Sequence, residues 1–157
     1  MRKIKLDRID RQILSDLQED GRMSNVDLAK RVGISAPPCL RRMRALEKAG
    51  YIKGYHAVIN PVVMDYNVTV FAHVSLSNHA ESELKAFAAI VDTWPRVRES
   101  HMMTGDTDFM LKVVARDWDD YQNFLTDTLT AAPNVAHVRS NLSIRTTKEK
   151  PGVPIEV

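Results

Sequence analysis

The spacing of apolar and turn-forming residues over the first 50 positions constrains the fold more than any other feature of this chain. Apolar residues recur at helical spacing from Leu6 to Leu17, which predicts an amphipathic helix over residues 7–19. Residues suited to helix starts and helix ends divide the stretch that follows: Ser24, Gly33, Ser35 and Gly50. We therefore predict a short second helix that ends at Gly33 and a third helix that runs to about Ala49.

Two helices joined by a short glycine-containing turn are typical of a helix-turn-helix, in which the later helix enters the DNA major groove. A three-helix bundle without a ligand would show the same spacing. The third predicted helix favours DNA binding, because Arg41, Arg44 and Lys48 lie within roughly 60° of one another, opposite its apolar arc. No acidic residue interrupts this cationic face. The second helix has an expected inner stripe of three residues: Val26, Ala29 and Val32.

The distribution of charge also separates the chain into two modules. Residues 1–60 hold 13 Lys and Arg against 7 Asp and Glu, a net charge of +6, whereas the remaining residues hold 9 against 13, a net charge of −4. A basic first module suggests a polyanion as its partner, here double-stranded DNA. Solvated charge that is merely uneven along the chain is the alternative.

The candidate DNA contacts lie on and beside the third helix. Pro37 and Pro38 are tolerated in a first turn, and their rings could meet thymine methyl groups while Arg41 reaches a base edge. Arg42 lies at the rim of the apolar arc, where we expect it to contact phosphate or to lie along the apolar surface. Lys53 is the obvious contact if the following segment forms a wing. The full predicted set is Ser35, Pro37, Pro38, Arg41, Arg42, Arg44, Lys48 and Lys53.

From Val68 the pattern changes to strict alternation, as in a strand with one buried face. The following patterns predict a helix over 81–91, strands over 96–104 and 109–115, a helix after Asp117 and a strand over 135–146. This β-α-β-β-α-β order is that of the ferredoxin-like fold, with both helices on one sheet face. The other face has a mixed composition that suggests a dimer joined through it: Phe71, His73, Lys112, Val114 and Asn141.

We therefore expect an α+β protein with an N-terminal, winged-helix-like helix-turn-helix domain and a C-terminal ferredoxin-like domain. Residues 1–52 form the first domain, 53–66 a hinge strand and linker, 67–147 the second domain, and 148–157 a flexible tail. The hinge strand is predicted from the aromatic and β-branched residues between Tyr51 and Pro61.

Five segments in matching order over nearly the whole chain carry a family resemblance: residues 6–14, 28–35, 39–47, 50–52 and 105–109. The last of these has a Gly-x-x-Asp-aromatic pattern. With these segments the chain resembles the Lrp/AsnC (feast/famine) transcriptional regulators. The resemblance implies a DNA-binding regulator whose C-terminal domain dimerises and senses an amino acid or related metabolite. It also implies that dimers assemble further, commonly into octamers.

The resemblance places an effector near the loop 104–108, surrounded by Thr104, Gly105, Asp106 and Asp108. A carboxylate suits an α-ammonium group, and backbone N–H groups of a glycine turn suit an α-carboxylate. The alternative is an ordinary tight turn between two strands, capped by Asp106.

Other chemistries find little support in the sequence. The single cysteine, Cys39, excludes an internal disulfide, and the five histidines show no metal-ligand spacing, so we expect no metal, cofactor or catalytic residue. No segment predicts a membrane span or a secretory signal, and we expect a cytoplasmic, nucleoid-associated protein. An effector-independent architectural DNA organiser remains an alternative. RNA binding is less favoured, since the predicted sheet lacks paired exposed aromatics.

Overall fold

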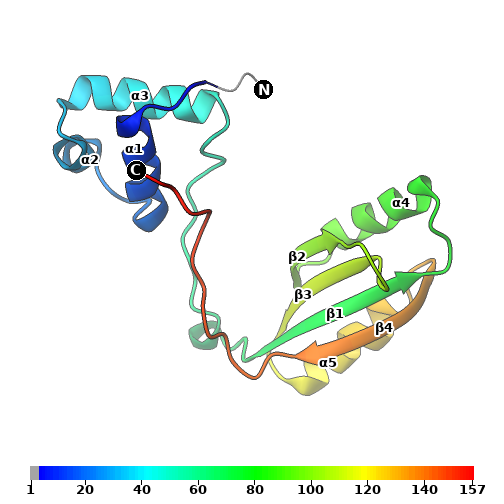
Figure 1. Ribbon diagram of the computed structural model, residues 1–157. Helices are drawn as coiled ribbons and strands as arrows, with labels where there is room; N and C mark the ends of the chain where they lie inside the picture. Colours follow the sequence, from blue (N-terminus) through cyan, green and yellow to red (C-terminus); the bar gives the residue numbers. More distant parts are fainter. Residues whose placement is uncertain (1–3) are drawn as a thin grey trace. The chain divides into compact units, whose positions relative to one another are not determined.

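The structure is a computed structural model that describes residues 4–157. These residues divide into two compact units (Figure 1). One unit combines the residues up to Val58 with Lys148–Val157, and the other contains Ile59–Thr147. The segment 148–157, which we predicted as a flexible tail, is therefore grouped with the N-terminal helices.

The first unit contains three helices, which begin and end close to the predicted positions: α1 (Arg8–Glu19), α2 (Asn25–Val32) and α3 (Ala36–Lys48). Their ends follow from local hydrogen bonding. Asp7 accepts from the Asp10 N–H at 2.8 Å while the Asp10 carboxylate accepts from the Asp7 N–H, which forms a reciprocal capping box. Ser24 Oγ accepts from the Asp27 N–H, and Gly33 ends α2 with a φ of 73°.

The core of this unit lies where the three helices meet, and six side chains are buried in it: Ile13, Leu17, Leu28, Ala29, Cys39 and Leu46. The predicted inner stripe of α2 is wrong at one position, because Val26 is 54% exposed and Leu28 is fully buried. A spacing of three or four residues fits either choice. The side that α2 turns inward is decided by its packing on α1 and α3.

The predicted hinge strand does not form within the single chain. The structure describes all of residues 51–61, and no strand forms there; residues 53–60 are extended and exposed. A strand needs a neighbour that pairs with its backbone, and aromatic and β-branched composition alone does not supply one. A short 3-10 turn, Val62–Met64, follows this extended segment.

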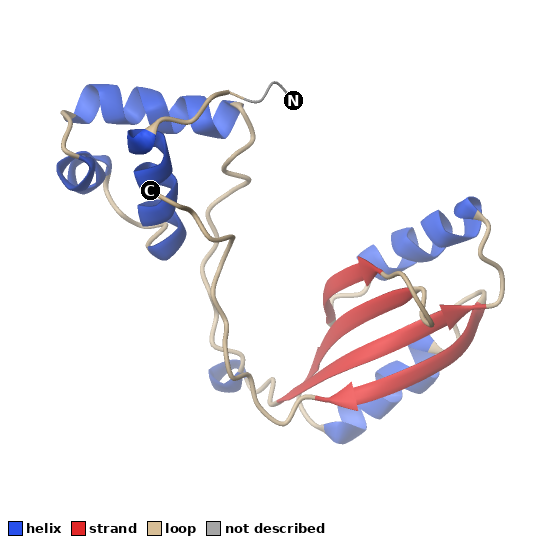
Figure 2. Ribbon diagram, viewed as in Figure 1, coloured by secondary structure: helices blue, strands red, loops and turns tan. Residues whose placement is uncertain are grey.

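The second unit is a four-stranded antiparallel sheet with two helices (Figure 2). Its elements are β1 (Val68–Leu76), α4 (Glu81–Asp92), β2 (Val97–Met102), β3 (Phe109–Ala115), α5 (Trp118–Phe124) with a π-helical turn at Leu125–Leu129, and β4 (Val135–Leu142). The strand order is β2-β3-β1-β4, which is the ferredoxin-like arrangement that the sequence predicts. The last strand ends at Leu142, earlier than the predicted Thr146.

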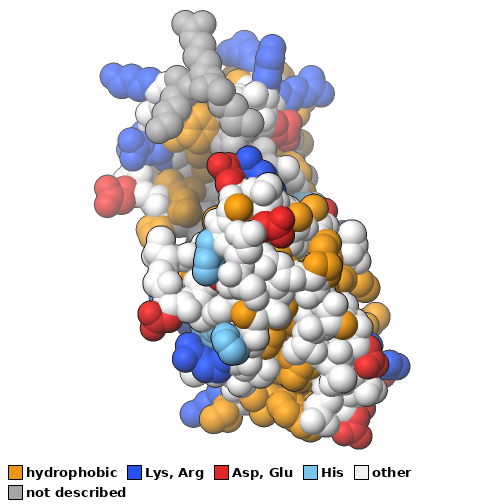
Figure 3. Space-filling view, turned by 90° about the vertical axis from the view of Figure 1, so that its right-hand side faces the viewer, with side chains coloured by type: hydrophobic (Ala, Val, Ile, Leu, Met, Phe, Trp, Pro, Cys, Tyr) orange, Lys and Arg blue, Asp and Glu red, His pale blue; other side chains and the backbone are white. Residues whose placement is uncertain are grey.

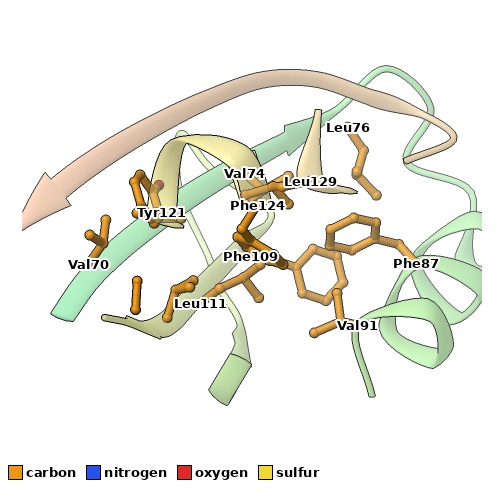
Figure 4. Close-up of a cluster of buried hydrophobic side chains, with 13 residues drawn as sticks. Val70, Val74, Leu76, Phe87, Val91, Phe109, Leu111, Tyr121, Phe124 and Leu129 are labelled. Atoms are coloured by element: carbon orange, nitrogen blue, oxygen red, sulfur yellow. The ribbon is translucent and has the colours of Figure 1, made fainter. Parts of the chain in front are cut away.

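Both helices cover the same face of this sheet, where they enclose an apolar core (Figure 4). Alternate residues of β1 and β3 point into this core, among them the fully buried Val74 and Leu111. Phe87 of α4 packs against Phe109 with ring centroids 4.9 Å apart. The alternation predicted from the sequence is therefore the alternation of burial in the structure.

The opposite sheet face is neither a core nor a fully solvated surface. Phe71, His73, Lys112 and Val114 are half-buried there, and Asn141 is exposed. None of the helices in residues 4–157 has the length and apolar character that spanning a lipid bilayer requires.

Candidate functional site

The outer face of α3 carries the candidate DNA contacts. Arg41, Arg44 and Lys48 are exposed there, while Cys39 and Leu46 on the inner face are buried. Among the described residues, none of the three outer cations forms an ion pair with a carboxylate. Figure 3 shows Lys and Arg side chains gathered at the upper end of the view, over the helical unit. This face keeps its positive charge available to an anionic partner.

Arg42 lies apart from these cations, although it is their neighbour in sequence. Its Nη1 donates to Asp7 Oδ2 at 2.7 Å and to Asp10 Oδ1 at 2.8 Å. These hydrogen bonds, first that to Asp10 and then that to Asp7, raise the pKa of Arg42. The Asp10 backbone N–H and the Arg42 guanidinium together lower the pKa of Asp7. Arg42 thus fastens α3 to the capped start of α1, and its guanidinium is occupied inside the unit.

The start of α3 offers few backbone donors to a phosphate. Pro37 and Pro38 occupy its first turn and have no N–H, and the Cys39 N–H donates to the Ser35 carbonyl at 3.3 Å. Ser35 occupies the N-cap position, but its hydroxyl makes no capping hydrogen bond. The first turn therefore presents proline rings and one serine hydroxyl.

Asn25 is a residue that sequence reasoning missed. Its Nδ2 donates to the Ala36 carbonyl at 2.9 Å, which joins the start of α2 to the start of α3, while its Oδ1 is buried without a hydrogen-bond partner. An asparagine beside an N-cap serine gives no signal of its own, because the Ala36 carbonyl is 11 residues away. Lys53, in contrast, is among the predicted DNA contacts, and it is exposed on the extended segment that follows α3.

The loop between β2 and β3 contains the candidate effector residues. Thr104, Gly105 and Asp106 are exposed, and Gly105 has a φ of 110°, a backbone conformation that favours glycine. The Asp106 carbonyl accepts from the Ser75 hydroxyl at 3.3 Å, which fixes the loop beside the end of β1. The exposed Asp106 carboxylate and the backbone of the glycine turn remain accessible.

Asp108 is more deeply engaged than the rest of the loop. Its Oδ2 accepts from the Leu76 N–H at 2.8 Å and lies 3.2 Å from His79 Nε2. Its own N–H donates to the Val74 carbonyl at 2.9 Å. The Asp108 carboxylate therefore joins the loop to the end of β1, whereas no hydrogen bond of the Asp106 carboxylate is found among the described residues. The involvement of His79 was not predicted, because no local pattern connects it with a position 29 residues later.

Within residues 4–157, no group of three or more His, Cys, Asp or Glu side chains is arranged to hold a metal ion. The thiol of Cys39 is buried in the helical core, and this burial raises its pKa.

Two protein-family models match separate parts of the chain. Residues 6–53 match the winged helix-turn-helix DNA-binding model, and residues 69–153 match the Lrp/AsnC ligand binding domain. The first range contains α1 to α3 with the cationic face, and the second contains the sheet except for Val68, together with the loop 104–108.

Relatives of known type are similar over nearly the full length. The leucine-responsive regulatory protein of Rhizobium meliloti is 49% identical over 147 residues, which is 94% of each chain. The protein of the same name from Escherichia coli K12 is 41% identical over 144 residues, which cover 92% of this chain and 88% of the relative.

Two solved structures of regulators are also similar to this chain over nearly its full length. A transcriptional regulator from Neisseria meningitidis in complex with L-Met superposes with a TM-score of 0.91 at 35% identity, covering 96% of this chain and 97% of that chain. An AsnC family regulator from Agrobacterium tumefaciens superposes with a TM-score of 0.89 at 36% identity, covering 95% and 97%. The chain belongs to the Lrp/AsnC family of transcriptional regulators, with a DNA-binding helix-turn-helix followed by a ligand-binding domain.

Proposed function

We propose that this regulator reads double-stranded DNA with the outer face of α3 and binds an amino acid at the loop 104–108. The observation that carries the DNA part is the exposed set of Arg41, Arg44 and Lys48 on one helix face, without a partner carboxylate among the described residues. No catalytic step is part of the proposal, and the site of action is the cytoplasm, where DNA is accessible.

Each DNA contact has a distinct role. Arg41 and Arg44 reach base edges, for which a guanidinium supplies paired donors, and Lys48 contacts phosphate. Pro37 and Pro38 place apolar rings against thymine methyl groups, and the Ser35 hydroxyl and Lys53 add phosphate contacts. Since the two prolines remove backbone donors from the first turn, sequence preference depends in part on DNA shape.

The ligand site uses the exposed part of the loop. The Asp106 carboxylate accepts from the α-ammonium group, and backbone N–H groups around Gly105 and Thr104 hold the α-carboxylate. Asp108 contributes through Oδ1, because its Oδ2 already accepts from the Leu76 N–H. The L-Met complex of the Neisseria meningitidis regulator supports an amino acid as the class of ligand.

We also propose that copies of this chain associate with one another. The sheet face with the half-buried Phe71 and Val114 is more apolar than a solvated surface needs to be, and the same unit also exposes Ile144. A second copy of the chain covers this surface in a dimer, and dimers assemble further, into octamers as is common in the family. Size-exclusion chromatography with light scattering measures this assembly directly.

The ligand part is tested by thermal denaturation of the purified protein against each common amino acid at millimolar concentration. A ligand at a hundred times its dissociation constant raises the free energy of unfolding by about 2.7 kcal/mol. We expect one chemically related group of amino acids to raise the Tm, and Asp106→Asn to abolish this rise without changing the Tm of the free protein. Asp108→Asn serves as the contrast, because it lowers the Tm even without ligand. If no amino acid raises the Tm, the amino-acid site is refuted and the DNA part stands on its own measurement.

A further inference from the structure

The segment 148–157, which follows the sheet unit in the chain, lies along α1 of the DNA-binding unit (Figure 1). The Gln18 amide makes two hydrogen bonds to one residue of this segment. Its Nε2 donates to the Val153 carbonyl at 2.9 Å, and its Oε1 accepts from the Val153 N–H at 3.0 Å. Arg11 Nη1 donates to the Glu156 carbonyl at 3.2 Å. These bonds bind the backbone of an extended peptide at two places along α1.

The surface beneath this segment is hollow and mainly apolar. A cavity of about 650 Å³ lies between α1 and residues 51–55, and Val153–Glu156 form part of its wall. Leu14 and Leu17 of α1 contribute apolar surface to it, as do Tyr51 and Ile52. Ile155 is half-buried, whereas the rest of residues 151–157 are exposed. Backbone hydrogen bonds combined with one inserted apolar side chain are a common mode of peptide recognition.

The docked position of this segment requires a glycine at position 152. Its φ is +70°, which L side chains rarely adopt, and a Cβ atom there would lie 1.9 Å from Gln18 Oε1. A side chain at position 152 would therefore be strained by the backbone and would displace the amide that holds Val153. Glycine is needed here for the docked arrangement, and it would not be needed in a free tail.

We propose that the groove formed by α1 and residues 51–55 is a docking site for the extended segment Gly152–Glu156 of the same chain. The occupant is identified by the hydrogen bonds of Gln18 and Arg11 to its backbone. The chain therefore passes between the two units twice, after Val58 and before Lys148. This inference goes beyond the proposed function and does not depend on it.

Amide hydrogen exchange of the full chain, resolved at single residues, tests the docking. We expect the Val153 N–H to be protected, and Gln18→Ala and Gly152→Val to reduce this protection by about tenfold or more, because docking can no longer sequester the amide. Glu156→Gln is the matched control, since it changes a side chain of the segment and keeps the carbonyl that Arg11 binds. We expect it to leave the protection unchanged. A Val153 N–H that exchanges at the rate of a free peptide, or protection that survives Gln18→Ala, would overturn the proposal.

A mixing experiment separates docking within one chain from docking between two copies. One chain carries Gln18→Ala and keeps its tail, and the other keeps Gln18 and ends after Lys150. The two chains are unfolded together and refolded, so that mixed oligomers form. If docking is within one chain, the Val153 N–H stays unprotected in the mixture. Restored protection would show that a second copy supplies the segment and would contradict the same-chain assignment.

Discussion

The outer face and the inner edge of α3 carry the same kind of side chain and use it in opposite ways. Arg41 and Arg44 are exposed and pair with no carboxylate among the described residues, whereas Arg42 binds both Asp7 and Asp10. One guanidinium therefore orients the helix within the unit, and its neighbours remain available to DNA. The cations of a basic helix therefore need not all bind DNA, because a cation that faces carboxylates of its own unit is held by them.

The largest effect should follow from removing both outer arginines. Each contact of an arginine to a base edge contributes about 1–3 kcal/mol, so Arg41→Ala with Arg44→Ala should weaken DNA binding by about a hundredfold or more. Fluorescence anisotropy with DNA selected by the unmodified protein measures the affinity. Lys85→Ala is the control, because it removes one exposed cation from α4 of the other unit. An unchanged affinity in the double variant would show that the outer arginines of α3 do not contact DNA.

Removal of Arg42 at the inner edge should instead lower the stability of the protein. Arg42→Ala leaves the Asp10 carboxylate, whose side chain is only 12% exposed, without its cationic partner, and should lower the free energy of unfolding by about 1–2 kcal/mol. Arg41→Ala should change it by less than about 0.5 kcal/mol. Urea denaturation of the two variants measures the difference. Equal losses in both would mean that the two arginines do not differ in role.

The second unit contains an arginine pair that resembles the inner edge of α3. Arg96 and Arg116 both bind Asp120, and the hydrogen bonds from Arg96 in particular lower the pKa of this carboxyl group far below its usual value. In acid the unfolded chain then binds a proton that the folded chain does not. The free energy of unfolding should therefore fall as the pH drops below about 4, and the fall should be shallower in Asp120→Asn. Urea denaturation between about pH 6 and pH 2, the range in which carboxyl groups titrate, measures both slopes. Parallel slopes would exclude this pair as the cause.

The smallest predicted effect concerns Lys48. A phosphate contact is independent of DNA sequence, so Lys48→Ala should weaken binding to selected and unrelated DNA alike. It should also reduce the slope of log K against log salt concentration by about 1. Titrations at several salt concentrations measure this slope. A loss confined to the selected DNA would reassign Lys48 to base recognition.

The sequence predicted those features that depend on neighbouring residues. Ser24 and Gly33 mark the ends of α2 because capping is local, and the alternation from Val68 identifies β1 because burial follows it directly. Arg42 could not be assigned in this way, since its partner carboxylates lie 32 and 35 positions away. The predicted hinge strand does not form within the single chain for the same reason, because pairing with a neighbouring strand is not encoded in local composition.

The candidate sites also differ in whether they depend on neighbouring residues or on distant ones. The cationic face of α3 follows from helical periodicity alone and is present in the structure. The hydrogen bond from the Leu76 N–H to Asp108 and the docking of Val153 on Gln18 join positions 32 and 135 residues apart. No local pattern could predict either contact. The sequence therefore predicts the turn between β2 and β3, but it does not distinguish the contacts of Asp106 from those of Asp108.

The most direct test of the central claim is the ratio of the Kd values for unrelated and selected DNA, measured for the unmodified protein and for Arg41→Ala. The selected DNA is obtained from a random library with the unmodified protein. If Arg41 reads a base edge, Arg41→Ala should reduce this ratio by about tenfold, while the free energy of unfolding stays unchanged. A variant that retains both the ratio and the affinity of the unmodified protein would contradict the assignment of the outer face of α3 to DNA recognition.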